Sequence, residues 1–146
     1  MKRYYLLTLL LLTGCQKNVV VEEPTVTPLD YDITIEDTIK WSDLFLQEEE
    51  RYLVYVYSET CGYCKMIKQD VLSYYLLNKD RMYFVCSSKD EVPFDITKDI
   101  PIGISTVENL YLRGTPTMLE VENKCLSKVY EGSESIKNYI EENKII

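Results

Sequence analysis

The chain has 146 residues, of which 46% are apolar, and this composition is sufficient for one packed domain. Its 16 basic and 24 acidic residues give a net charge of −8, which argues against nucleic-acid binding because phosphate contacts need clustered lysine and arginine. The sequence has no histidine, which excludes Cys-His nucleophilic pairs, histidine-bearing zinc sites and histidine general bases.

The first fifteen residues, MKRYYLLTLLLLTGC, are typical of an export signal. Lys2 and Arg3 precede an apolar run that is shorter than the ~20 residues a membrane-spanning helix needs. The ending LTGC resembles the lipobox of bacterial lipoproteins, which implies a signal peptide of residues 1–14 and a diacylated Cys15. Two acyl chains would anchor the protein to the extracytoplasmic face of the cell membrane, where disulfides persist. The alternative is an ordinary secretory signal with a chance cysteine.

The segment that follows is expected to be an extended tether. Residues 15–34 contain two prolines and scattered charge and show no helical period, although an added edge strand at VVV (19–21) is an alternative. Regular elements are predicted after about residue 33, so the folded domain is assigned to residues 35–146.

The domain is predicted to be an α/β fold, a three-layer arrangement in which a central mixed sheet of about four to five strands is flanked by helices on both faces. A strand, a helix and a strand in succession favour parallel pairing, and a late hairpin adds an antiparallel pair. The predicted elements, in chain order, are a short helix over 43–50, a buried strand in YLVYVYS (52–58), a helix of about four turns from the first CxxC cysteine, a second buried strand in RMYFVCSS (81–88), two hairpin strands in TPTMLEVEN (115–123) and KCLSKVYEG (124–132), and a helix in ESIKNYIEENKII (134–146).

Two cysteines, Cys61 and Cys64, form a CxxC pair in SETCGYCKMI, and several kinds of site use this spacing. A c-type haem is excluded because Lys65, not histidine, follows the second cysteine, and copper-delivery sites generally add a histidine as well. A structural zinc is disfavoured because Cys86 and Cys125 are isolated and 39 residues apart. A disulfide across so short a loop would stabilise the fold little. A redox-active dithiol without metal or cofactor is therefore the favoured interpretation.

A strand-to-helix junction at this pair gives the two sulfurs different roles. Cys61 is expected at the N-terminus of the helix, where unpaired N–H groups and the helix dipole favour the thiolate. Gly62 lets the chain turn tightly and Tyr63 fills the second intervening position. Cys64, one turn deeper, is expected to attack the mixed disulfide at Cys61 and release the partner.

These residues resemble the thioredoxin-like fold family. The resemblance covers about residues 35–146 and rests on YLVYVYSETCGYCKMI together with GTPT, whose Pro116 lies 52 residues after Cys64. It implies that Pro116 is cis and faces the CxxC pair, and that the backbone of Thr115 pairs with an extended substrate. A trans proline that opens an edge strand is the alternative. The Gly-Tyr dipeptide is similar to that of periplasmic disulfide isomerases.

The sequence also departs from the thioredoxin pattern. Tyr55 stands where the family has a buried acid, and Tyr83 stands where it usually has a lysine. Proton removal from Cys64 would then use water, Glu59, a tyrosine or the partner. We expect these differences to favour exchange with a dedicated extracytoplasmic partner.

One further segment and two isolated cysteines also need an interpretation. The segment 87–105 is longer than a minimal thioredoxin needs, and it is either an acidic lip that selects partners or a solvated insertion. Cys86 and Cys125 are expected on strands at opposite sides of the CxxC strand, too far apart to pair, and to act as small buried apolar residues.

The function expected from these features is that of a membrane-anchored, extracytoplasmic thiol-disulfide oxidoreductase. We expect a monomer that exchanges disulfides with exported client proteins, with the reductase or isomerase direction favoured, and that depends on an unknown membrane redox partner. The alternative is a thioredoxin-fold lipoprotein adaptor or chaperone for exported peptides, whose CxxC pair is not essential.

Overall fold

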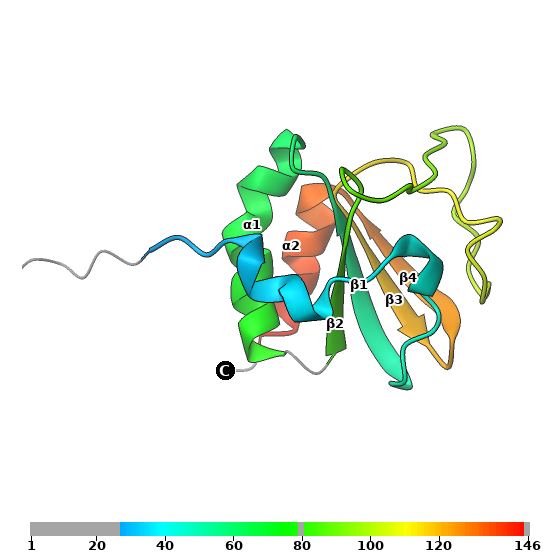
Figure 1. Ribbon diagram of the computed structural model, residues 1–146, viewed down its shortest axis with the longest axis horizontal. Helices are drawn as coiled ribbons and strands as arrows, with labels where there is room; N and C mark the ends of the chain where they lie inside the picture. Colours follow the sequence, from blue (N-terminus) through cyan, green and yellow to red (C-terminus); the bar gives the residue numbers. More distant parts are fainter. Residues whose placement is uncertain (1–26, 79–80, 145–146) are drawn as a thin grey trace, which may run out of the picture.

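The structure, a computed structural model, describes residues 27–78 and 81–144, and its centre is a mixed four-stranded sheet (Figure 1). The strand order is β2-β1-β3-β4. The predicted α/β fold class, a central mixed sheet flanked by helices, is confirmed by this sheet and its helices. The elements, in chain order, are the 3₁₀ helices η1 (Tyr31–Asp37) and η2 (Trp41–Asp43), β1 (Arg51–Tyr57), α1 (Gly62–Leu77), β2 (Met82–Cys86), β3 (Thr117–Glu122), β4 (Cys125–Glu131) and α2 (Gly132–Glu142).

The strand before the CxxC pair, β1, lies inside the sheet. It pairs in parallel with β2 and antiparallel with β3, so that Tyr55 lies between Phe84 and Met118. Six successive residues of β1, from Tyr52 to Tyr57, are buried. Such a continuous apolar run is typical of a strand covered on both faces, and that prediction is confirmed.

The two faces of the sheet are covered by different kinds of structure. Both α-helices, α1 and α2, pack on the face that carries Tyr55 and Tyr57 (Figure 1). The other face is covered by η2 and by the long segment between β2 and β3, which buries Val92, Leu110 and Leu112. The expected α-helix on this face is absent from the described residues. Pro93 and Pro101 interrupt the segment, and each removes a backbone donor that a helix would use.

The prediction of a short helix over residues 43–50 is wrong. The structure has the 3₁₀ helix η2 (Trp41–Asp43), and irregular backbone connects it to β1. Trp41, Leu44 and Phe45 are buried against the sheet, whereas Leu46 is exposed. An isolated helix of eight residues is unstable in water, so the burial of these three side chains determines the local conformation.

The end of the expected tether is folded onto the domain. The backbone of Leu29 makes two reciprocal hydrogen bonds with the side-chain amide of Gln69 on α1, at 2.9 and 2.8 Å. Asp30 caps η1 and forms an ion pair with Lys68, at 2.7 Å, and the ring of Tyr31 stacks on Tyr57 with centroids 3.8 Å apart. The packed structure therefore begins before residue 35. The sequence does not predict this start, because the contacts join residues that are distant in the chain and leave no local sequence pattern.

The predicted hairpin between β3 and β4 is present. Asn123 and Lys124 form its turn with φ of 51° and 64°, the left-handed conformation that two-residue hairpin turns require. At the far ends of the sheet, Cys86 on β2 and Cys125 on β4 are both free thiols. Cys86 is buried as predicted, but Cys125 is only partly buried.

If the segment between β2 and β3 is a structural layer, shortening a buried side chain in it will destabilise the whole domain. Leu112→Ala is expected to lower the free energy of unfolding by about 2–5 kcal/mol, because it leaves a cavity in the core. Ile96→Ala, in the same segment but 73% exposed, should change it by less than about 0.5 kcal/mol. Urea unfolding measures the free energy of unfolding of both variants. Equally small changes in the two variants would identify the segment as a solvated insertion.

Candidate active site

The loop that joins β1 to α1 is held by side chains on both sides. The N–H of Cys61 donates to the carbonyl of Ser58, at 3.2 Å. The hydroxyl of Ser88, just beyond β2, accepts from the N–H of Glu59 at 2.9 Å and bonds the hydroxyl of Ser58 at 3.0 Å. These bonds link the loop to the start of the long segment and position the CxxC pair at the carboxyl end of β1.

Cys61 and Cys64 form a disulfide at the N-terminus of α1. Cys61 is the N-cap residue, and its Sγ accepts a hydrogen bond from the N–H of Cys64 at 3.0 Å. Cys61 is partly exposed, whereas Cys64 is 1% exposed. The N-terminal position stabilises negative charge on the Cys61 sulfur when the disulfide is reduced, so the two sulfurs differ in both access and charge stabilisation.

Thr115 and Pro116 lie beside the Cys61 sulfur. The peptide bond between them is cis, and the carbonyl oxygen of Thr115 is 3.3 Å from Sγ of Cys61. In the reduced protein the S–H group can donate to this oxygen. Among the described residues, the N–H of Thr115 has no hydrogen-bond partner. An open groove of about 270 Å³ runs along this edge, and its lining residues are Arg113, Gly114, Thr115, Pro116, Thr117, Glu131 and Gly132.

The residues between the two cysteines face the solvent. Tyr63 is 64% exposed, and Met66, one turn further along α1, is 71% exposed. A Cβ atom built at Gly62 would meet no atom within 4 Å, so the space beside the disulfide is open. The structure thus brings Cys61, Gly62 and Tyr63 to one surface, together with the Thr115 edge.

Tyr55 and Tyr83 lie on opposite faces of the sheet. Tyr55 is buried in the same core cluster as Cys64, and burial raises its pKa far above the ordinary range. Tyr83 packs in the other cluster, where its hydroxyl donates to Glu49 at 2.7 Å. The β2 residue that packs in the cluster of Cys64 is Phe84, and Tyr83 is not part of that cluster.

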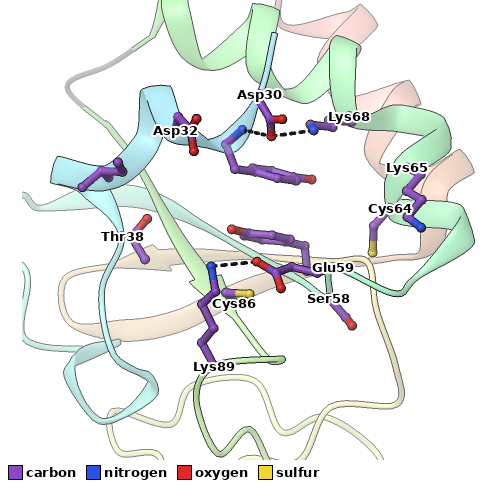
Figure 2. Close-up of a pocket in the computed structure, with 13 residues that line it drawn as sticks. Asp30, Asp32, Thr38, Ser58, Glu59, Cys64, Lys65, Lys68, Cys86 and Lys89 are labelled. Atoms are coloured by element: carbon purple, nitrogen blue, oxygen red, sulfur yellow. Dashed lines mark hydrogen bonds and ion pairs between the residues drawn. The ribbon is translucent and has the colours of Figure 1, made fainter. Parts of the chain in front are cut away.

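A second recess, which we call the Cys64 pocket, has a volume of about 430 Å³ and lies between η1, the end of β1 and α1 (Figure 2). Figure 2 shows the sulfur of Cys64 pointing toward this space. The sequence does not predict this pocket, because one of its walls is η1, a helix that the sequence analysis did not predict. Its lining residues are Asp30, Tyr31, Asp32, Ile35, Thr38, Tyr57, Ser58, Glu59, Cys64, Lys65, Lys68, Cys86 and Lys89.

The wall of the Cys64 pocket carries balanced charge. Lys89 and Glu59 form an ion pair at 2.7 Å, and Lys68 is bonded to Asp30. Burial raises the pKa of Tyr31 to about 12, and burial also raises the pKa of Tyr57. The phenols are therefore neutral at physiological pH and cannot act as bases there. A tyrosine base for Cys64 therefore does not fit Tyr31 or Tyr57, and water, Glu59 and the partner stay predicted routes for its proton.

Residues 27–78 and 81–144 include no cluster of three or more side chains that could ligate a metal ion. No helix within this part of the chain is long and apolar enough to cross a membrane. Cys15, the expected lipidation site, and the signal peptide lie outside the described residues.

Several solved thioredoxin structures are similar to this chain. Mitochondrial thioredoxin 3 from Saccharomyces cerevisiae in its oxidized form is 16% identical, with a TM-score of 0.48, and the match covers 72% of this chain and 92% of that chain. Thioredoxin f2 from Chlamydomonas reinhardtii is 15% identical (TM-score 0.47; 73% and 94% covered). The thioredoxin from Plasmodium falciparum is 19% identical (TM-score 0.46; 74% and 99% covered). No protein-family model and no curated protein matches the sequence.

The different environments of the two sulfurs predict different alkylation rates in the reduced protein. Cys61 should react with iodoacetamide at pH 7 at least about tenfold faster than Cys64, because its thiolate is stabilised and accessible. Mass spectrometry of the cysteine-containing peptides separates the two rates, and the partly exposed Cys125 provides an internal reference. Alkylation of Cys61 no faster than that of Cys125 would contradict this assignment.

Proposed function

We propose that this protein is a thiol-disulfide oxidoreductase that exchanges disulfides with client proteins. The observation that carries the proposal is the position of the Cys61–Cys64 disulfide at the N-terminus of α1, with the partly exposed Cys61 sulfur beside the backbone of Thr115. A disulfide that only stabilised the fold would gain little from so short a loop. A reactive dithiol needs one accessible, charge-stabilised sulfur and one protected sulfur, and this pair has both.

In the reductive direction, the Cys61 thiolate attacks one sulfur of a client disulfide. The client S–S bond breaks, its second sulfur leaves as a thiolate, and a mixed disulfide joins Cys61 to the client. The Cys64 thiolate then attacks Sγ of Cys61, which releases the client thiolate and restores the Cys61–Cys64 disulfide. The client gains two electrons and two protons, and the protein loses them. The same steps in reverse oxidise a client dithiol.

The surface around Cys61 supports a protein as substrate. The N–H of Thr115 and the groove beside Pro116 can pair with an extended client segment, as strand addition does at a free sheet edge. Tyr63 and Met66 supply exposed apolar area beside the reactive sulfur. Such area stabilises a transient complex without a deep binding cavity.

We also propose that the protein acts as a monomer at the extracytoplasmic face of the bacterial cell membrane. The lipobox-like LTGC sequence at Cys15 supports this location, and residues 15–28 would link the anchor to the domain. The reductase or isomerase direction then requires a membrane redox partner that returns electrons to the Cys61–Cys64 pair.

Replacing either cysteine separates an oxidoreductase from an adaptor that only holds client peptides. Cys61→Ser should reduce the rate of insulin disulfide reduction to that measured without the protein, because the attacking sulfur is lost. Cys64→Ser should instead accumulate mixed disulfides with clients, which are released by dithiothreitol. Cys125→Ser, on the edge strand, serves as the matched control and should keep wild-type activity. Retention of the cellular phenotype by Cys61→Ser would favour the adaptor function.

The anchoring proposal predicts a change in fractionation. Cys15→Ala should move the protein from the membrane fraction to the soluble extracytoplasmic fraction, because no acyl chains can be attached. Immunoblotting of the two fractions measures the change, with Cys125→Ser as the control. Membrane association of Cys15→Ala equal to that of the wild type would exclude lipidation as the anchor.

A further inference from the structure

We propose that residues 93–98 form a surface, which we call the client lip, whose exposed Phe94 and Ile96 bind an apolar side chain of the client near its reactive cysteine. The client lip would make the protein prefer polypeptide disulfides over small disulfides, because a small disulfide has no side chain to place there. This inference rests on the proposed function, since it adds a second binding surface for the client beside the groove at Thr115.

The backbone of the client lip is bonded to the segment that leads to Thr115. Phe94 and Leu112 form a parallel bridge. The N–H of Leu112 donates to the carbonyl of Pro93 at 3.0 Å, and the N–H of Asp95 donates to the carbonyl of Leu112 at 2.9 Å. Since Leu112 is completely buried, this bridge fixes the start of the client lip to the core.

The client lip lies next to the open groove beside Cys61. Arg113, which follows Leu112, lines this groove, as does Thr115. Three residues span at most ~11 Å, so the bridge at Leu112 lies within that distance of Thr115. Figure 1 shows that the yellow-green part of the long segment reaches the same end of the domain as the N-terminus of α1. A client chain that pairs with Thr115 can therefore also contact the client lip.

Further contacts hold the turn of the client lip in place. The carboxylate of Asp95 accepts hydrogen bonds from the N–H and the hydroxyl of Thr97, at 3.0 and 2.6 Å. Lys98 pairs with the same carboxylate group at 3.5 Å, and its Nζ lies 3.5 Å from the centre of the Tyr111 ring. A surface that is ordered before binding loses little conformational entropy when a ligand binds, so this order favours recognition.

The apolar side chains of the client lip face the solvent. Phe94 is 45% exposed and Ile96 is 73% exposed, whereas Leu110 and Leu112 in the same segment are completely buried. The core is therefore formed without Ile96 and with only part of Phe94. Exposed apolar area beside a binding groove is typical of an interaction surface, because its burial on binding is favourable.

The charged side chains of the client lip and of the adjoining groove are already paired. Lys98 pairs with Asp95, and Arg113 pairs with Glu131 at 3.8 Å. A charged client side chain would compete with these pairs, whereas an apolar side chain would only displace water from the apolar residues of the lip. The chemistry of the client lip therefore fits an apolar client residue.

The place of the client lip predicts where the apolar residue of the client lies. An extended client that pairs with Thr115 runs alongside residues 113–117, and the client lip lies on the Arg113 side. Because a strand advances ~3.3 Å per residue, we expect the apolar residue about two to four positions from the client cysteine, on one side of it.

Matched client peptides test the proposal with the reduced full-length protein. Each client is a disulfide-linked peptide dimer with one cysteine per chain in a glycine-serine background, and leucine replaces serine at one position at a time. Leucine at an expected position should raise the second-order rate of thiol loss from the protein at least about threefold, through partial burial of its side chain. Equal rates for leucine and serine at every position would overturn the proposal. Equal gains on both sides of the cysteine would also contradict it, since they indicate general apolar attraction.

Variants of the client lip locate the preference for leucine. Phe94→Ala and Ile96→Ala should each remove most of the advantage of leucine, whereas Phe94→Leu should keep it. Ile96 is mostly exposed, so the effect of its replacement cannot be assigned to a folding defect. Leu77→Ala, 63% exposed at the other end of α1, is the matched control and should keep the full advantage. An unchanged advantage in both alanine variants would contradict the assignment.

A small disulfide separates client binding from the chemistry of the CxxC pair. Bis(2-hydroxyethyl) disulfide should oxidise the reduced wild type and the client-lip variants at equal rates, because these variants leave Cys61 and Cys64 unchanged. A loss of this rate that parallels the loss with peptides would overturn the proposal. The proposed function fails separately, if the wild-type protein exchanges disulfides with neither insulin nor this small disulfide.

Discussion

The hydrogen bond from the N–H of Cys64 to the sulfur of Cys61 is the interaction on which the proposed chemistry depends. It exists because β1 ends at Tyr57 and α1 begins at Gly62, so that Cys61 occupies the N-cap position. The unpaired N–H groups of the first helical turn stabilise negative charge on one sulfur of the pair and not on the other. This asymmetry separates the attacking sulfur from the resolving sulfur.

The core around Cys64 is rich in aromatic residues. Tyr55, Tyr57 and Tyr31 surround this side of the sheet as neutral phenols, since burial raises the pKa of each. The ionised groups near Cys64 instead lie on the wall of a solvent-connected pocket, as in the Lys89–Glu59 pair.

The two layers that cover the sheet have different roles in this arrangement. The α1 and α2 layer holds the CxxC pair, and η1 lies against it through the contacts of Asp30 and Tyr31. The opposite layer is irregular, yet it buries Leu110 and Leu112 completely and hydrogen-bonds the CxxC loop through Ser88. The long segment between β2 and β3 thus supports both the core and the active-site loop. Whether it also selects partners stays a prediction.

The sequence alone determined the strands, both α-helices, the hairpin and the position of the CxxC pair at a helix start. Each of these depends on local pattern: apolar runs, helical spacing and the strand-to-helix junction. Tertiary packing decided the rest. The docking of Tyr31 on Tyr57, and with it the Cys64 pocket, joins residues that share no sequence period. Glu120 is 1% exposed within a strand because Arg51 and the hydroxyl of Tyr130 reach its carboxylate, at 2.8 and 3.0 Å. Contacts between residues distant in the chain leave no periodic signal in the sequence, so only the folded structure reveals them.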